Sequence, residues 1–300
     1  DLMKMQRVPT VDVPAGGTVT FAPMAYHVML FNLKDRSLLQ DGKRFPLTLH
    51  FEKGVPTAID GEKMDGVSIV KKLNELASAM GGWGYLTYSG FSKRPAAQPT
   101  SFLTGTVLIS AWMAGKSFGL SLDDKIFTRA LKFLKSQRTP AGTYVYSLSH
   151  SFYPGRPINR HTGSLARTPA CDYAIRLWEP EDISLRQLVD GLDRLWSRRG
   201  WLTMALHKPT PHESFAQNSG YFFYYGYYYS GMCLDMLAPN QVKRHASLLA
   251  DDILTRQGTD GAWWDYPLYN YHKFYGTGYA LYAVSRVRES LYPSDAATTS

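Results

Sequence analysis

The feature that most constrains the fold is a helix–turn–helix unit in Thr255–Tyr282. Gln257, Gly261 and Trp263 stand at relative positions 0, +4 and +6, at the end of the amphipathic run Val242–Arg256. Glycine supplies the positive φ that a helix exit tends to need. The tryptophan can then fold back onto the two helices that the turn joins. The stretch therefore predicts two helices joined by a tight turn, and the same turn can be sought elsewhere in the chain.

From Val67 onward the apolar pattern is helical. In 122–137, Ile126, Ala130, Phe133 and Leu134 follow the i, i+4, i+7, i+8 spacing of a packed amphipathic helix. A mainly α fold is therefore expected. The predicted helices are 67–80, 101–118, 122–137, 164–178, 182–198, 217–237, 239–256 and 277–290.

Two degenerate copies of the opening turn precede it. One has Gln137, Gly142 and Tyr144, and the other keeps only glycine and tryptophan, at Gly81-Gly82-Trp83. This repeated turn resembles the prenyltransferase and squalene-cyclase repeat over residues 67–291. The resemblance implies an α/α toroid of paired helices around a central cavity. Because a complete toroid of that family has more helices than are predicted here, we expect an incomplete ring.

Residues 1–54 have a different pattern, with short strand-like runs separated by glycine and proline turns. We expect a small antiparallel β unit there, then a linker at 55–66, the helical domain at 67–292 and a tail at 293–300. The predicted strands are Val8–Val13, Thr18–Phe21, Tyr26–Leu33 and Phe45–Phe51.

Within the β unit, Met5 is followed by 21 residues and then by His27-Val28-Met29. This spacing resembles the second half of a PCuAC-type periplasmic copper chaperone, which has a cupredoxin-like fold. The resemblance implies Cu(I) held by Met5, His27 and Met29, a copper-accepting partner, and a periplasmic or secreted location. The family's first His–Met pair would lie before Asp1, so we expect a β unit truncated at its N-terminus.

The chemistry of these side chains agrees with copper binding, because thioether sulfur and imidazole favour soft Cu(I) over hard cations. The alternative is that these three residues have a structural role and bind no metal. Met5 and Met29 are then core residues, and His27 is a histidine satisfied by its neighbours.

The catalytic motifs of known toroid enzymes are absent from the sequence. There is no Asp-x-Asp-Asp acid, no Asp-x-Cys zinc spacing, no nucleophile elbow, no P-loop and no dinucleotide fingerprint. Two constellations remain as candidates for acid–base work: His212 with Glu213, and Asp265 with His272. The alternative for the first pair is that it caps the helix that follows.

The chain is rich in tyrosine, with 20 Tyr against 14 Phe and 7 Trp. Tyrosine combines an apolar ring with a polar tip, which suits cavity walls and surfaces that stack on sugars. The alternative is that the tyrosines pack between helix layers. The candidates for lining a cavity are Tyr221, Tyr224, Tyr225 and Tyr228, which share one helix face, together with Tyr269.

The net charge of +8 is spread along the chain, and neither a basic stripe nor a nucleic-acid module is visible, so no nucleic-acid partner is expected. No apolar run is long enough to span a bilayer. Cys171 and Cys233 allow either one disulfide or two buried thiols.

These observations lead to one main hypothesis and two alternatives. The main hypothesis is an extracytoplasmic Cu(I)-binding module joined to a toroid that binds a ligand or partner without catalysis. The first alternative is a toroid enzyme acting on a polyisoprenoid or a glycan in a tyrosine-lined cavity. The second is a structural subunit of a larger assembly.

Overall fold

The computed structural model describes residues 49–52, 55–59, 62–63, 77–78, 81–89, 92–95, 98–119, 125–266 and 271–292. The chain divides into two units, 1–48 and 49–300, and all described residues belong to the second. The first three predicted strands therefore lie outside the described residues. So does the predicted helix 67–80, apart from residues 77–78.

Two small sheets lie in the N-terminal part of the second unit. The first is antiparallel in the order β1-β2-β3 (Leu49–Glu52, Val55–Ile59, Glu62–Lys63), and Leu49 pairs with Ile59. The second is a hairpin of β4 (Leu86–Ser89) and β5 (Ser92–Pro95). Strand β1 overlaps the predicted strand Phe45–Phe51. Strands β2 and β3 lie within the range 55–66, which we had expected to be a linker, while the domain boundaries themselves stay predictions.

The rest of the described chain is helical, so the prediction of a mainly α fold is confirmed. Every predicted helix from 101–118 onward overlaps an observed one. The α-helices are α2 Ser101–Phe118, α3 Lys125–Ser136, α4 Arg167–Trp178, α5 Leu185–Arg198, α6 Gly200–Thr203, α7 Phe222–Cys233, α8 Pro239–Leu254 and α9 Tyr271–Leu291. The 3₁₀ turns are η2 Leu148–Phe152, η3 Pro157–Asn159 and η4 Leu234–Met236.

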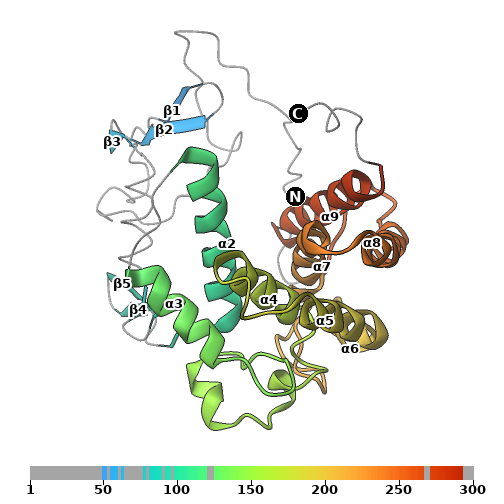
Figure 1. Ribbon diagram of the computed structural model, residues 1–300, viewed down its shortest axis with the longest axis horizontal. Helices are drawn as coiled ribbons and strands as arrows, with labels where there is room; N and C mark the ends of the chain where they lie inside the picture. The colour runs from blue at the N-terminus through green and yellow to red at the C-terminus, as the bar shows by residue number, and fades with distance from the viewer. Residues whose placement is uncertain are drawn as a thin grey trace, which may run out of the picture. The chain divides into compact units, whose positions relative to one another are not determined.

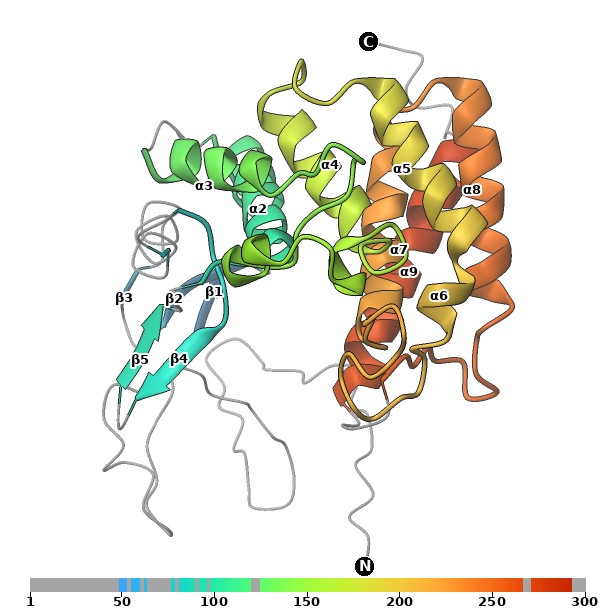
Figure 2. The same ribbon diagram turned by 90° about the horizontal axis from the view of Figure 1, so that it is seen from below.

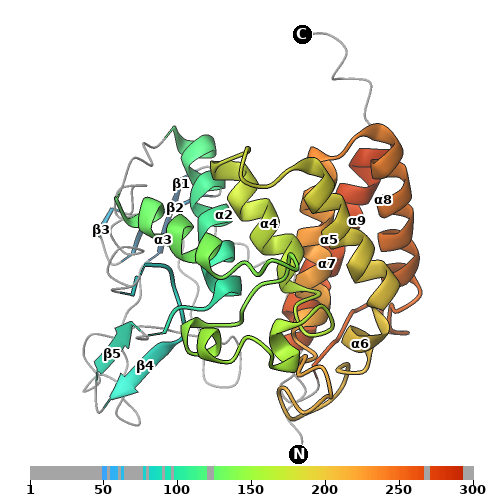
Figure 3. The ribbon, with the colours of Figure 1, turned by 60° about the horizontal axis from the view of Figure 1, so that its bottom comes forward.

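Four of the long helices pack as one row, and the others lie beside it (Figure 1). Helices α2, α4, α7 and α9 contact one another in that order. Of the other helices, α3 contacts α2 and α4, and α5 contacts α4 and α8; Figure 2 and Figure 3 show α5 and α8 beside each other. Helix α3 follows the predicted amphipathic pattern, because all four predicted apolar positions are buried.

Helix α7 lies at the centre of the packing and is buried on all sides except at Tyr228. Its contact with α4 is close. A Cβ atom added at Gly226 would lie 2.7 Å from the Cβ and 2.8 Å from the Cα of Ala166. Glycine at this position therefore lets the two chain segments approach within the distance that a side chain would occupy.

The turn after α8 has the geometry expected from sequence. Gly261 has a φ of 79°, and the side-chain amide of Gln257 donates to its carbonyl at 2.8 Å. Trp263 folds back and is only 3% exposed, with its indole N–H donating to the carbonyl of Ile253 at 2.8 Å. The prediction for this turn is confirmed.

The three turns share a contact that was not predicted. In each, the aromatic residue after the turn donates its backbone N–H to a Ser or Thr hydroxyl at 3.0 or 3.1 Å, and that hydroxyl donates to the same residue's carbonyl at 3.3 Å. We call this contact the hydroxyl clasp. The pairs are Trp83 with Thr104, Tyr144 with Ser164, and Trp263 with Thr277.

Candidate functional site

Three loops meet at one end of the helices. The Asn218 side chain donates to the carbonyl of Thr162 at 2.8 Å, and the His207 N–H donates to the carbonyl of Asp265 at 3.0 Å. Polar side chains from different parts of the sequence are brought together there. The loops are 137–166, 204–221 and 263–266.

His212 is the centre of this region. Its Nδ1 atom lies 2.7 Å from the carbonyl oxygen of Gln217, and its Nε2 atom lies 3.2 Å from the hydroxyl of Tyr221. Because a carbonyl can only accept, Nδ1 carries the proton and Nε2 is the acceptor. Burial lowers the pKa of His212, so the ring is neutral near pH 7. Its backbone has a φ of 61°, a conformation that is uncommon outside glycine.

Two further tyrosines and a second histidine surround His212. The hydroxyls of Tyr85 and Tyr146 lie 2.7 Å apart. The ring of Tyr146 packs edge-on against His150 at 5.2 Å and His212 at 5.4 Å. Tyr85 has an exposed ring, but burial of its hydroxyl end raises its pKa to about 12. We call Tyr85, Tyr146, His150, His212 and Tyr221 the imidazole–phenol cluster.

Arg167 lies beneath the imidazole–phenol cluster and is 1% exposed. Its guanidinium carbon lies 5.1 Å from the centre of the Tyr146 ring, which is a cation–π distance. Among the described residues it forms no ion pair, and its Nε atom has no hydrogen-bond partner. Burial lowers its pKa, although arginine remains protonated. In the part of the chain that the structure describes, the guanidinium donates to three carbonyls, those of Gly163, Tyr144 and Ile158.

Exposed aromatic side chains lie on the same loops. Phe152 is 78% exposed, Tyr153 is 60% exposed and Phe215 is 75% exposed. Phe215 is held against the ring of Trp201 at 5.7 Å. These rings belong to the loops that supply His150 and His212, and they leave apolar surface that water can reach.

Asp265 and His272 are brought together through Tyr275. The Tyr275 hydroxyl lies 3.3 Å from a carboxylate oxygen of Asp265 and 2.6 Å from Nδ1 of His272. Asp265 is fully buried, which raises its pKa to about 7. Its other oxygen accepts the backbone N–H of Tyr224 at 3.4 Å. Burial lowers the pKa of His272. A carboxyl group that titrates near neutral pH is suited to proton transfer.

The histidines of the two predicted acid–base pairs, His212 and His272, lie at the two ends of one chain of rings. Tyr221 packs against Tyr266 at 5.6 Å, and Tyr266 packs against His272 at 4.7 Å. Glu213 is placed differently, because it is exposed and pairs with Lys208 at 3.1 Å. Its carboxylate is therefore at the surface, whereas His212, Asp265 and His272 are at least partly buried.

The predicted cavity-lining tyrosines are largely packed into the core. Tyr224 is 2% exposed and Tyr225 is 7% exposed, and the Tyr225 hydroxyl donates to the carbonyl of Phe102 at 3.2 Å. Tyr228 is half-buried against Tyr282 on α9. Of this set, only Tyr221 belongs to the imidazole–phenol cluster, and Tyr269 lies outside the described residues.

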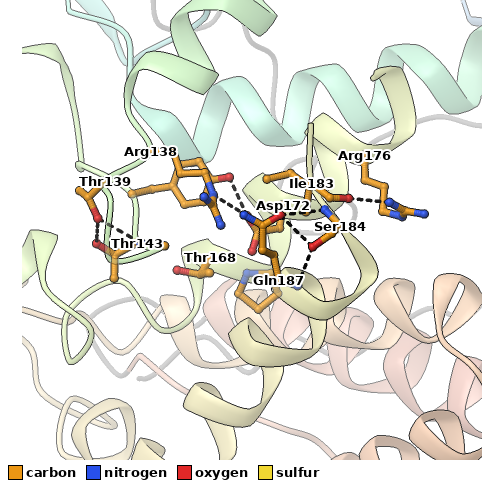
Figure 4. A network of polar contacts seen from close by, with 12 residues as sticks. Arg138, Thr139, Thr143, Thr168, Asp172, Arg176, Ile183, Ser184 and Gln187 are labelled. Atoms are coloured by element: carbon orange, nitrogen blue, oxygen red, sulfur yellow. Dashed lines mark hydrogen bonds and ion pairs between the residues drawn. The ribbon is translucent and has the colours of Figure 1, made fainter. Parts of the chain in front are cut away.

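A second polar network joins α3, α4 and α5 (Figure 4). Asp172 is fully buried, accepts the Tyr144 hydroxyl at 2.7 Å and lies 3.5 Å from Nε of Arg138. Burial raises the pKa of Asp172 to about 6. Lys135 is paired with carboxylates at the surface, including Asp182 at 2.7 Å. The buried end of the network is less complete, because Oδ2 of Asp172 and Nε of Arg138 have no hydrogen-bond partner among the described residues. The adjoining cleft of about 390 Å³ is lined by Lys135, Arg138, Thr139, Pro140, Ile175, Asp182 and Ile183.

Both cysteines are free thiols, which decides between the two alternatives left by the sequence. Cys171 and Cys233 are buried, and their sulfur atoms contact the carbonyls of Ser101 and Pro169. Burial raises the pKa of both thiols. A buried, protonated thiol is a poor nucleophile, so neither belongs to the site.

The predicted metal ligands Met5, His27 and Met29 lie outside the described residues. In the part of the chain that is described, no group of three or more His, Cys, Asp or Glu side chains has the arrangement of a metal site. Among the described residues, no helix has both the length and the apolar composition needed to cross a bilayer.

Sequence reasoning missed Tyr85, Tyr146, His150 and Arg167. These residues are far apart in the sequence, and no motif connects them. One signal was available: the segment from Gln137 to Cys171 contains no Asp or Glu. Its four basic residues are Arg138, Arg156, Arg160 and Arg167.

Comparisons with known proteins match only short parts of the chain. Residues 1–61 match the LpqE-like family, described as "Putative lipoprotein LpqE-like". A stretch of 35 residues, 12% of this chain, is 60% identical to the argininosuccinate synthase of Moorella thermoacetica and covers 9% of that protein. A stretch of 33 residues, 11% of this chain, is 58% identical to the enzyme of Methanosarcina mazei and covers 8% of it. No solved structure matches the chain.

These comparisons correct both resemblances drawn from the sequence. Residues 1–61 match the LpqE-like lipoprotein family, so the assignment to the PCuAC-type chaperones was wrong. The assignment of 67–291 to the toroid repeat was also wrong, since no solved structure matches and the matched relatives are argininosuccinate synthases. A turn motif of a few residues fixes a local helix exit, and it does not determine how helix pairs follow one another.

Proposed function

We propose that this protein is an extracytoplasmic, carbohydrate-binding protein, with the imidazole–phenol cluster as its binding site. The observation that carries the proposal is the combination of exposed rings at Tyr85 and Tyr153 with the Tyr221 hydroxyl, which can accept a hydrogen bond while it donates to His212. A sugar ring presents apolar C–H faces and a rim of hydroxyls, so it needs both kinds of surface. A polyisoprenoid would instead need a long apolar cavity, and the tyrosines predicted to line one are packed into the core.

The proposed location rests on the N-terminal match. A lipoprotein family is consistent with a place outside the cytoplasm, in the periplasm or at the cell surface. Polysaccharides of cell walls and capsules are found in the same compartment.

Affinity electrophoresis of the protein through gels containing a panel of soluble polysaccharides tests the proposal. We expect retardation by at least one of them, and we expect Tyr85→Ala and Tyr153→Ala to weaken it. Phe274→Ala is the matched control, because Phe274 is also an exposed aromatic residue, at 64%, but lies on α9. Equal loss in all three variants, or no retardation by any polysaccharide, would contradict the proposal.

A second candidate function is acid–base catalysis on the bound sugar. The neutral His212 ring, held by Gln217 and turned toward the Tyr221 hydroxyl, is the observation that favours it. Asp265 and His272 would provide a second pair of proton-transfer groups. If the site is catalytic, His212→Gln removes release of sugar products while binding persists. If it only binds, no products form with the unaltered protein either.

We also propose that Met5, His27 and Met29 bind Cu(I), which a copper-accepting partner would then receive. The support is the soft character of thioether and imidazole ligands, together with the placement of His27 and Met29 two residues apart on a predicted strand, where they share one face. Anaerobic Cu(I) titration of the whole protein and of the Met5→Ala/His27→Ala/Met29→Ala variant tests this. We expect loss of at least one tight site in the variant, and equal affinity in the two proteins would refute copper binding there.

A further inference from the structure

The surroundings of the imidazole–phenol cluster are cationic. Loop 137–166, which supplies Tyr146 and His150, carries no carboxylate. Of its three arginines, Arg138 pairs with Asp172 of α4 at 3.5 Å, which leaves Arg156 and Arg160. The facing loop 204–221 contains one carboxylate, Glu213, which is neutralised by Lys208 at the surface. A ligand that contacts loop 137–166 therefore meets the positive charge of Arg156 and Arg160, which no carboxylate of these two loops balances.

Arg167 is the strongest indication of this imbalance. A buried guanidinium is normally paired with a carboxylate, because an unpaired charge is costly away from water. Here its partners within the described residues are three carbonyls and the rings of Tyr146 and Phe222, and its Nε atom has no acceptor. An anion bound above Tyr146 would supply part of the missing negative charge.

Two exposed arginines extend the positive charge outward. Arg156 and Arg160 lie on the loop of His150, and neither has an ion-pair partner in the described part of the chain. The guanidinium of Arg156 lies 4.9 Å from the centre of the exposed Tyr153 ring. A ring and an arginine side by side can contact a sugar and its carboxylate at the same time.

We infer that the ligand of this site is an acidic polysaccharide, whose uronate carboxylates bind Arg156 and Arg160 while its sugar rings stack on Tyr85 and Tyr153. The inference rests on the proposed carbohydrate binding and narrows it to one class. A polymer fits better than a small anion, because the exposed rings and arginines are spread over two loops and a strand end. Nucleic acid is the main competing polyanion, and it is included in the test.

Polygalacturonate and its fully methyl-esterified form are suitable probes, because they share a backbone and differ in carboxylate charge. We expect the protein to bind polygalacturonate roughly tenfold more tightly, as charge-assisted hydrogen bonds are lost with the ester. Added NaCl should weaken the binding of polygalacturonate more than that of the ester. Equal affinity for the two polymers would overturn the inference but leave carbohydrate binding in place. If the protein binds neither of these two polymers and no neutral polysaccharide, the proposed function itself is refuted.

Two double variants that remove the same amount of charge distinguish binding at a defined site from non-specific attraction to positive charge. Arg156→Ala/Arg160→Ala should lose most of the preference for polygalacturonate. Lys243→Ala/Arg288→Ala removes two exposed cations from α8 and α9 and should keep it. Equal loss in both variants, or equally tight binding of a single-stranded oligonucleotide by the unaltered protein, would overturn the inference, since either result indicates non-specific attraction.

Discussion

The Nε2 atom of His212 faces the hydroxyl of Tyr221 at 3.2 Å, in surroundings where burial holds the pKa of the imidazole below its ordinary value. A donor to Nε2 stabilises the neutral ring, so Tyr221→Phe should raise the pKa of His212 toward its ordinary value. Imidazole NMR titrations of both proteins measure this shift. His245, which accepts the indole N–H of Trp196 at 2.9 Å, is the internal control and should not change. An unchanged or lower pKa for His212 in the variant would show that the contact does not hold the ring.

Asp265 makes the stability of the protein depend on pH. Its folded pKa, about 7, is above the ordinary value near 4, so the folded state holds the proton more strongly than the unfolded state does. Its destabilising effect is absent below about pH 4 and grows as the pH rises through 7. Asp265→Asn keeps an acceptor for the Tyr224 N–H without the charge.

We therefore expect the unaltered protein to lose about 2 kcal/mol more than Asp265→Asn between pH 5 and pH 8 in urea unfolding. Asp172 also titrates in this range but is present in both proteins, so the difference isolates Asp265. Parallel pH profiles would mean that the folded pKa of Asp265 is not raised.

Gly226 and Gly278 should respond oppositely to alanine. At Gly226 the new methyl group would meet the backbone of Ala166 at 2.8 Å, so we expect a loss of about 1–3 kcal/mol from overpacking. At Gly278 nothing lies within 4 Å, and alanine should stabilise α9 by about 0.5–1 kcal/mol. Thermal unfolding of the two variants measures both effects. Equal changes of the same sign would contradict the close packing of α4 and α7.

The hydroxyl clasp between Thr277 and Trp263 should contribute to stability. Thr277→Val keeps the shape of the side chain but leaves a backbone N–H and carbonyl without their partner, which costs about 1–3 kcal/mol. Thr203→Val is the control, because the Thr203 hydroxyl makes only a single bond to the Arg199 carbonyl in the short helix α6. A smaller loss at Thr277 than at Thr203 would show that the clasp is not stabilising.

The helices could be predicted because their signals are local. The apolar spacing in 122–137 and the glycine turn at Gly261 each reside within one short segment, and both were confirmed. The predicted ends of the helices were less accurate. Helix α9 begins at Tyr271, six residues before the predicted start at 277, because tertiary packing carries the helix into a sequence with little amphipathic pattern.

The site could be predicted only in part, because it depends on which loops meet. His212 and Tyr221 are close in sequence, and both were candidates, His212 for acid–base work with Glu213 and Tyr221 for lining a cavity. Tyr85 and Tyr146 are 61 residues apart, and only folding brings their hydroxyls to 2.7 Å. The helical face of Tyr224 and Tyr225 was predicted from spacing, but spacing could not show that α7 is surrounded by other helices.

The central claim, that carbohydrate binds at the imidazole–phenol cluster, is tested most directly by imidazole NMR of the ¹⁵N-histidine-labelled protein. The spectrum is assigned with His150→Gln and His212→Gln variants and recorded during titration with tetragalacturonate and with cellotetraose. The account predicts that the resonances of His150 and His212 shift with at least one of these sugars while that of the buried His245 stays in place. Saturable binding that leaves both His150 and His212 unchanged would contradict it.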